Sequence, residues 1–179
     1  DRVMEKNTGA VIEARRQSLM DSVNNFSRWR LMQNKLDGNS AISSVIFGDA
    51  AIEEGVFHEC MNFAVLQNLN VLFVCENNSF SIYTHIRQRQ SDKRKLEDIA
   101  KGYGMDARHL EGSDVLLVDK ASKQAVEYIR SGKGPYFLII DTYRWREHCG
   151  PNEDDHLDYR NGEEVSYWLD NCSLGKLLS

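Results

Sequence analysis

Two polar residues, Asp49 and Asn78, each follow a short apolar run at the point where a buried strand would end. If the two runs form neighbouring parallel strands, both residues lie at one edge of the sheet. A carboxylate and an amide oxygen there form the hard, oxygen-only site that Mg²⁺ takes, with phosphate and water as its other ligands. Gly48 lets the backbone come close to a phosphate. Asp and Asn are also common turn residues, so from the residues alone a simple turn remains the more common alternative.

Positioning these residues requires a parallel sheet, and the hydrophobic pattern predicts one. Apolar runs predict buried strands at 44–47, 71–75 and 136–140, with a further strand at 106–111. Helical spacing and capping residues predict helices at 9–36, 55–68, 91–103 and 113–131. This alternation is typical of an α/β fold, a parallel sheet with helices on both faces, here with an N-terminal helix.

Domain organisation follows from the same pattern. We expect an N-terminal helical segment at 1–35, one α/β domain at 36–170 and a C-terminal tail at 171–179. The acidic segment from Asn152 to Glu164 is expected at the surface.

Composition excludes several classes of protein. The chain has 179 residues and a net charge of −5, which disfavours a nucleic-acid-coating or membrane-surface protein. No run approaches the ~20 apolar residues that a membrane span needs. The four cysteines are widely spaced, which argues against a disulfide scaffold or zinc knuckle and for a reducing, intracellular compartment.

Three motifs in register resemble one enzyme family. Residues 48–59 and 75–82 resemble the thiamine-diphosphate signature, which is GDG, then about two dozen residues, then NN. Their surroundings are similar to the thiamine-dependent alpha subunits of 2-oxo acid dehydrogenases of the pyruvate, branched-chain and acetoin types. Residues 134–148 resemble the family's GPxxIExxTYRYHGH, and residues 159–168 its closing YRxxEEVxxW. The similarity covers roughly residues 36–170.

The resemblance implies a thiamine-diphosphate-binding fold and specific site residues. Asp49, the side chain of Asn78 and the carbonyl of Phe80 would hold Mg²⁺. His148 would work beside the reacting carbon of the cofactor. The backbone that faces the diphosphate would come from Gly48, Ala50, Ala51, Ser81 and Ile82, with Asn78 and Phe80 on the same loop.

The same resemblance implies partners and a location. A separate beta-type subunit would complete the active site by supplying the glutamate that activates the aminopyrimidine. The assembly would then be an α₂β₂ heterotetramer or a homodimer-like oligomer acting on a small 2-oxo acid. The location would be cytoplasmic, or the mitochondrial matrix in a eukaryote.

Several positions depart from the family pattern. Ala50 replaces the glycine at the third position of GDG, and Glu53 stands where the family usually has Asn or Ser. A carboxylate ~6 Å from a phosphate charge would cost ~3 kcal/mol at an effective dielectric of ~20, unless it turned away. Cys149 replaces the serine that some members phosphorylate, and Arg146 replaces the first histidine of YRYHGH. Residues 1–28 match none of the family's motifs.

These departures keep alternatives open. The chain could be a non-catalytic assembly or regulatory subunit with the family fold, or a thiamine-dependent carboligase relative. Arg87 and Arg89 follow the Asn-Asn loop and could meet an anionic substrate or a phosphate, although an exposed surface position is the default for such residues.

Overall fold

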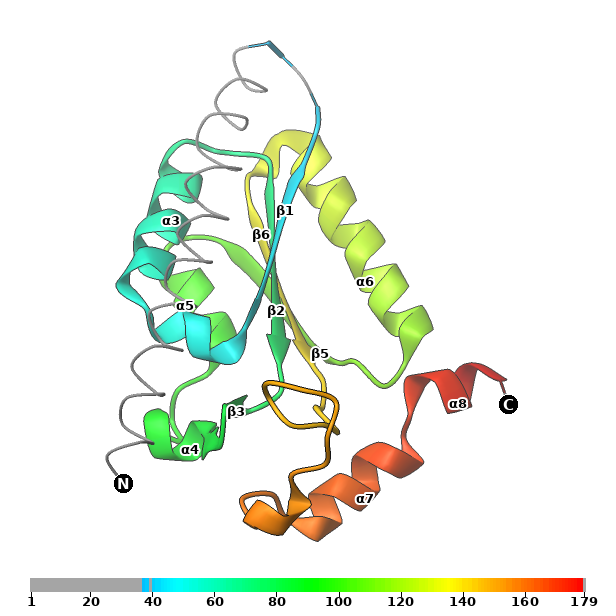
Figure 1. Cartoon of the computed structure of the whole chain (residues 1–179). Coiled ribbons are helices and arrows are strands. Elements are labelled where there is room, and N and C mark those ends of the chain that lie inside the picture. Colours follow the sequence, from blue (N-terminus) through cyan, green and yellow to red (C-terminus); the bar gives the residue numbers. More distant parts are fainter. Residues whose placement is uncertain (1–36, 39, 179) are drawn as a thin grey trace.

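The centre of the protein is a four-stranded parallel sheet, seen in a computed structural model that describes residues 37, 38 and 40–178 (Figure 1). The strands lie in the order β1-β2-β6-β5, and each neighbouring pair is parallel. Their bounds are Ser43–Gly48 for β1, Val71–Asn77 for β2, Asp106–Glu111 for β5 and Tyr136–Asp141 for β6. The four predicted strands are therefore confirmed, as is the α/β class.

A second, two-stranded antiparallel sheet follows β2. It consists of β3 (Phe80–Ser81) and β4 (Thr84–His85). This hairpin comes directly after the Asn-Asn loop and leads into the short helix α4 (Ile86–Arg89).

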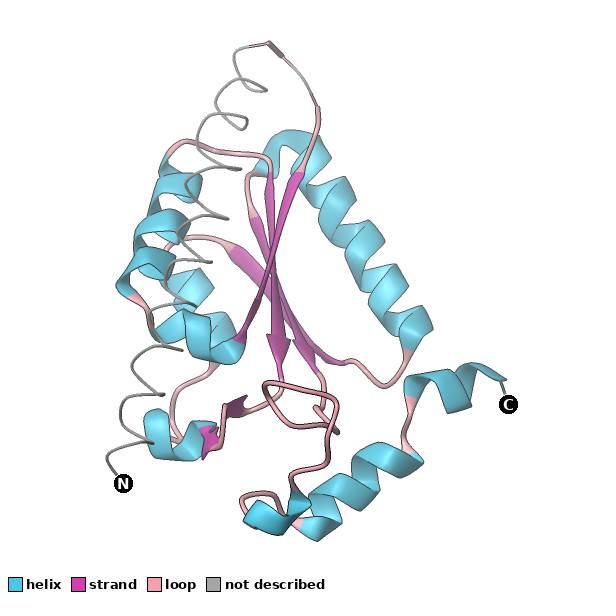
Figure 2. Ribbon diagram, viewed as in Figure 1, coloured by secondary structure: helices cyan, strands magenta, loops and turns pink. Residues whose placement is uncertain are grey.

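Helices cover both faces of the four-stranded sheet (Figure 2). The helical segments of the described residues, not all of which lie on the sheet, are in chain order η2 (Asp49–Glu53), α3 (Gly55–Leu66), α4, α5 (Leu96–Gly102), α6 (Val115–Tyr128), the π-type turn η3 (Ile129–Lys133), η4 (Asp155–Leu157), α7 (Gly162–Asp170) and α8 (Ser173–Leu178). In Figure 1, α3 and α5 lie on one side of the sheet and α6 on the other.

Three of the four predicted helices can be compared with the structure. The helices predicted at 55–68 and 113–131 are α3 and α6; Asp114 caps α6 by accepting hydrogen bonds from the backbone of Leu116 and Leu117. The helix predicted at 91–103 begins only at Leu96, which is its first buried apolar residue. The helix predicted at 9–36 lies outside the described residues. Within the described residues, no helix has the length and apolar composition to cross a membrane.

The core consists of two hydrophobic layers separated by the sheet. Phe73 and Phe137 pack toward α3 and α5, whereas Leu72 and Leu138 pack toward α6. Successive residues of a strand point to opposite faces, so each central strand must be apolar along its whole length. At the sheet edge, β1 has Ile46 62% exposed, because α6 covers β5 and β6 instead.

Candidate functional site at the carboxyl ends of the strands

The polar residues singled out by the sequence meet at one edge of the sheet. In the β1–β2 pair, Gly48 lies opposite Glu76, so Asp49 and the loop after Asn77 leave the sheet at the same level. η2, which begins at Asp49, contacts β3 (Phe80–Ser81). The residues expected to contact the diphosphate therefore lie together, although they come from two segments of the chain.

Asp49 is a buried carboxylate that already has a cationic partner. Only 1% of the residue is exposed, and its Oδ2 accepts a hydrogen bond from Nη2 of Arg89 at 2.5 Å. Burial raises the pKa of the Asp49 carboxyl above its ordinary value, while the hydrogen bond and charge of Arg89 act in the opposite direction. Arg89 therefore stabilises the charged form of a group that burial would otherwise neutralise.

Glu53 shares the same arginine. Its Oε1 accepts from Nη1 of Arg89 and from Nε2 of Gln90, the latter at 2.6 Å. The negative charge of Glu53 is thus opposed by a neighbouring cation, which reduces the repulsion expected between this carboxylate and a nearby phosphate. Arg89 itself is only 10% exposed, so the default expectation of an exposed surface position is wrong for this residue.

Ala50 fits the loop without backbone strain. It lies in η2, and it is absent from the described non-glycine residues with positive φ. An alanine therefore replaces the second glycine of the GDG signature without adopting a conformation that favours glycine.

The loop after β2 is held by its own asparagines. Oδ1 of Asn78 accepts from the backbone N–H of Phe80 at 2.9 Å, and Oδ1 of Asn77 accepts from that of Ser79 at 3.3 Å. Nδ2 of Asn77 donates to Oδ1 of Asp141 at 2.6 Å, which ties the loop to the end of β6. These contacts form a turn, which is the alternative that the Asn residues favoured from the sequence. They fix the backbone from Asn77 to Phe80.

Ile82 adopts an unusual backbone conformation at the tip of the β3–β4 hairpin. Its φ is 58°, which is unfavourable for a β-branched residue and requires support from its surroundings. Nη2 of Arg144 donates to the carbonyl of Ile82 at 2.7 Å, across 62 residues of sequence. The segment after β6 therefore supports the hairpin that the resemblance assigns to the diphosphate.

A buried polar cluster holds that segment together. Asp154 is 2% exposed; its Oδ1 accepts from Arg160, and its Oδ2 accepts from the Tyr159 hydroxyl at 2.7 Å. Arg160 also donates to the carbonyl of Arg144 at 2.7 Å. Burial and the hydrogen bond to Asp154 raise the pKa of Tyr159 to about 12. The expectation that the whole acidic segment lies at the surface is thus wrong for Asp154, because a local arginine and tyrosine compensate its burial.

His148 belongs to the loop that follows β6, and in Figure 1 this loop lies beyond the carboxyl ends of the strands. It is half-buried, and its neighbour Cys149 is exposed. The segment that contains His148 therefore leaves the sheet at the same edge as the loop after β2. Its role at a reacting group stays a prediction.

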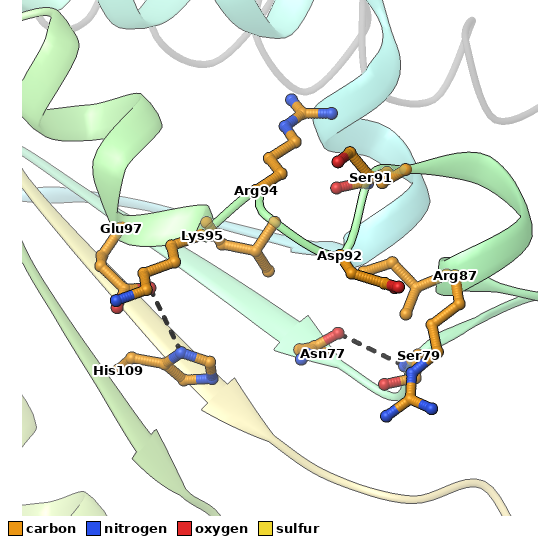
Figure 3. Close-up of a pocket in the computed structure, with 12 residues that line it drawn as sticks. Asn77, Ser79, Arg87, Ser91, Asp92, Arg94, Lys95, Glu97 and His109 are labelled. Atoms are coloured by element: carbon orange, nitrogen blue, oxygen red, sulfur yellow. Dashed lines mark hydrogen bonds and ion pairs between the residues drawn. The ribbon is translucent and has the colours of Figure 1, made fainter.

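A cavity of about 650 Å³ adjoins the Asn-Asn loop (Figure 3). Asn77 and Ser79 line one side, and His109 with Glu97 lines the opposite side. Nε2 of His109 lies 2.7 Å from Oδ1 of Asp141, and its Nδ1 lies 3.4 Å from Glu97. These carboxylates raise the pKa of His109, chiefly through the hydrogen bond with Asp141.

The oxygen atoms at the strand ends suit a Mg²⁺ ion. Asp49 supplies a buried carboxylate already in contact with a cation, and Oδ1 of Asn78 keeps a second lone pair besides the one used by Phe80. Within the described residues, no group of three or more His, Cys, Asp or Glu side chains could hold a metal. A divalent ion here would therefore depend on neutral oxygens and phosphate, as Mg²⁺ sites commonly do. The residues fit, provided that Arg89 moves.

A model of the family described as "Dehydrogenase E1 component" matches residues 9–174. The chain belongs to this family. The match begins well before residue 36, so the expectation that the similarity starts there is wrong. The expectation that residues 1–28 do not match the family is wrong for residues 9–28. Residues 9–28 contain no short motif of the family. The family model detects their similarity because it compares every position of the segment.

Individual relatives agree with this assignment. The chain is 36% identical over 138 residues to a pyruvate dehydrogenase E1 component subunit alpha of Zymomonas mobilis, covering 77% of this chain and 38% of that protein. It is 35% identical over 134 residues to a 2-oxoisovalerate dehydrogenase subunit alpha of Bacillus subtilis, covering 75% and 40%. The chain thus spans about two fifths of the length of these relatives. The resemblance to 2-oxo acid dehydrogenase alpha subunits is confirmed.

Among solved structures, a transketolase from Campylobacter jejuni is similar over 57% of this chain and 16% of its own, with 20% identity and a TM-score of 0.49.

Sequence reasoning missed the arginine that holds Asp49. Glu53 was the one signal in the sequence for such an arginine, because a second carboxylate beside a buried strand end requires a nearby cation. The sequence did not show which of the basic residues after the Asn-Asn loop would supply it, since Arg89 is 40 positions away from Asp49.

Proposed function

We propose that this chain forms the cofactor-diphosphate half of the active site in the alpha subunit of a thiamine-diphosphate-dependent 2-oxo acid dehydrogenase. One observation carries the proposal: in a member of this family, η2 with Asp49 contacts β3, which follows Asn78, at the carboxyl end of a parallel sheet. Ligands of open parallel sheets bind at that edge. The names of the relatives support decarboxylation of a small 2-oxo acid such as pyruvate or a branched-chain acid.

Asp49, Asn78 and the carbonyl of Phe80 would hold Mg²⁺, which in turn would bind the diphosphate. The backbone of residues 48–51 and 80–82 would face the phosphate oxygens. Thiamine diphosphate would supply the nucleophilic carbon and the electron sink that decarboxylation of a 2-oxo acid requires. The contribution of this chain is to position the diphosphate, to neutralise its charge and, through His148, to handle a proton at the reacting end.

Calorimetric titration tests the metal-dependent site. The full-length protein should bind thiamine diphosphate with Mg²⁺ and lose that binding with EDTA. Asp49→Ala should abolish the metal-dependent binding, whereas the control Asp119→Ala, an exposed carboxylate on α6, should leave it unchanged. Equal affinity in wild type and Asp49→Ala would contradict the proposal.

His148→Ala tests the catalytic assignment. With the partner subunit and a 2-oxo acid present, turnover should fall ~10²–10⁴-fold, because a general acid or base typically contributes that much. Cofactor affinity should stay at the wild-type value, since the ring would act at the reacting end. A wild-type rate in His148→Ala would remove the residue from the mechanism.

The proposal includes an oligomer that works only with a beta-type partner, in the cytoplasm or in a mitochondrial matrix. The family resemblance implies that a separate beta-type chain supplies the contacts to the aminopyrimidine end of the cofactor. Decarboxylation should therefore require the partner subunit. An ordinary enzymatic rate from the isolated chain would contradict this part of the proposal.

The ion pair between Asp49 and Arg89 favours a second candidate, a non-catalytic subunit whose metal ligand is permanently occupied. The same titration separates the two, because a permanently occupied Asp49 predicts no metal-dependent cofactor binding in the wild-type protein.

A further inference from the structure

Arg89 has all three guanidinium nitrogens engaged. Nη2 donates to Asp49, Nη1 to Glu53, and Nε to the carbonyl of Thr84 at 3.2 Å. The first two partners lie in η2 and the third in β4, so this one side chain joins the metal-ligand loop to the hairpin after the Asn-Asn loop. It is buried apart from 10% of its side-chain surface.

The guanidinium of Arg89 provides the positive charge that compensates the buried carboxylate of Asp49. A buried carboxylate requires a paired cation, and removal of that cation leaves an uncompensated charge. A Mg²⁺ ion at Asp49 would satisfy the same requirement. The two cations repel each other across a single carboxylate, so they compete for it.

Arg89 belongs to a short segment with few backbone anchors. α4 has four residues and follows the two-residue strand β4. It is anchored at its start by the backbone N–H of Ile86, which donates to the carbonyl of Ser79 at 2.7 Å, and Arg87 and Gln88 are exposed. Displacing Arg89 from Asp49 requires that the hydrogen bond of Nη2 break, whereas the hydrogen bond of Nη1 to Glu53 can persist.

Glu53 can remain paired with Arg89 after Arg89 has released Asp49. Its carboxylate already binds both Arg89 and Gln90 and belongs to the same η2 segment as Asp49. When Arg89 releases Asp49, the contact with Glu53 keeps the guanidinium close to the diphosphate position and keeps the charge of Glu53 compensated.

We infer that Arg89 is a built-in counter-cation of Asp49 that occupies the metal ligand until a divalent ion displaces it. This inference rests on the proposed Mg²⁺ site. It predicts that, without a divalent ion, Asp49 stays paired with Arg89, and that this competition lowers the affinity of the site for a divalent ion. The ion pair between Glu53 and Arg89 keeps the guanidinium near Asp49 and so affects how strongly Arg89 competes with the divalent ion.

Binding of Mn²⁺ alone, followed by electron paramagnetic resonance of the free ion, tests the inference without any catalytic assay. Arg89→Gln should bind Mn²⁺ at least ~10-fold more tightly than wild type, a typical size for coupling between two binding events. The control Lys93→Gln removes the same charge from an exposed position four residues away and should stay near the wild-type affinity. Arg89→Lys keeps a cation beside Asp49, so it should fold normally and show an intermediate gain; it serves if Arg89→Gln does not fold.

The possible failures are distinguishable. Equal Mn²⁺ affinity in wild type, Arg89→Gln and Arg89→Lys, with binding lost in Asp49→Asn, would overturn the competition and leave the metal site standing. Absence of Mn²⁺ binding in wild type and in both Arg89 variants would overturn the proposed metal site together with the inference.

Discussion

Asp49 and Asp154 are almost equally buried, at 1% and 2% exposure, and each is paired with an arginine. The pair of Asp154 is local, since Arg160 is six residues away, and the Tyr159 hydroxyl binds its other oxygen. The pair of Asp49 spans 40 residues and joins two separate elements of the fold.

This difference separates a structural ion pair from one that can exchange its cation. Around Asp154 the partners belong to one segment, and Arg160 also donates to the carbonyl of Arg144, so the cluster fixes the course of the chain after β6. Around Asp49 the partner belongs to a short helix beside an edge where ligands bind. Both pairs compensate the burial of a carboxylate, but we expect only the second to be replaced by a metal ion.

Arg160→Ala should give the largest loss of stability. Removing one partner of a buried ion pair typically costs about 3–5 kcal/mol, because the remaining charge stays desolvated. The loss should appear in urea unfolding and as faster hydrogen exchange in residues 143–160. A loss below about 1 kcal/mol would show that Asp154 is solvated in the variant and that the cluster is not structural.

Arg89→Gln should destabilise the apo protein by about 1–3 kcal/mol near neutral pH, since Asp49 then lacks its cation. The loss should shrink as the pH falls, because burial raises the pKa of Asp49 and the carboxyl can take up a proton. Mg²⁺ with thiamine diphosphate should restore the melting temperature of this variant but not that of Arg160→Ala. If the cofactor changed the melting temperatures of both variants equally, the ion pairs of Asp49 and Asp154 would not differ in their ability to exchange a cation.

His109→Gln should have a smaller, pH-dependent effect. Asp141 and Glu97 raise the pKa of His109 above 6.5, so its stabilising contribution is complete below that pH and is lost as the pH rises through the raised value. The side chains of His109 and Asp141 are 32% and 36% exposed, which limits the contribution to below about 1 kcal/mol. Thermal unfolding at about pH 6 and about pH 9 should show the wild-type advantage only at the lower pH. An equal advantage at both values would contradict this assignment.

Arg146→Ala should have the smallest effect and serves as the control for Arg160→Ala. Arg146 pairs with Glu153 at 3.0 Å, but the two side chains are 58% and 71% exposed. Exposed pairs of this kind contribute about 0–1 kcal/mol, so urea unfolding should be almost unchanged. A loss comparable with that of Arg160→Ala would mean that burial does not distinguish the pairs in this segment.

Much of the sheet could be predicted from the sequence, because central strands buried on both faces must be apolar throughout. The runs around Phe73 and Leu138 met this condition, and both strands were located within two residues of their ends. The start of α5 was predicted too early, because charged residues before Leu96 suit a helix but bury nothing there. Helical propensity alone does not define a helix boundary when no packing supports it.

Within the candidate site, the sequence by itself determined the positions of Asp49 and Asn78 at the ends of two strands, because the apolar runs that predict those strands come shortly before them in the chain. Only the tertiary structure decided their partners. Arg89 reaches Asp49 across 40 residues, and Arg144 reaches Ile82 across 62. Such contacts depend on which separate loops come together once the sheet has formed. Residue types and local spacing do not specify which loops those are.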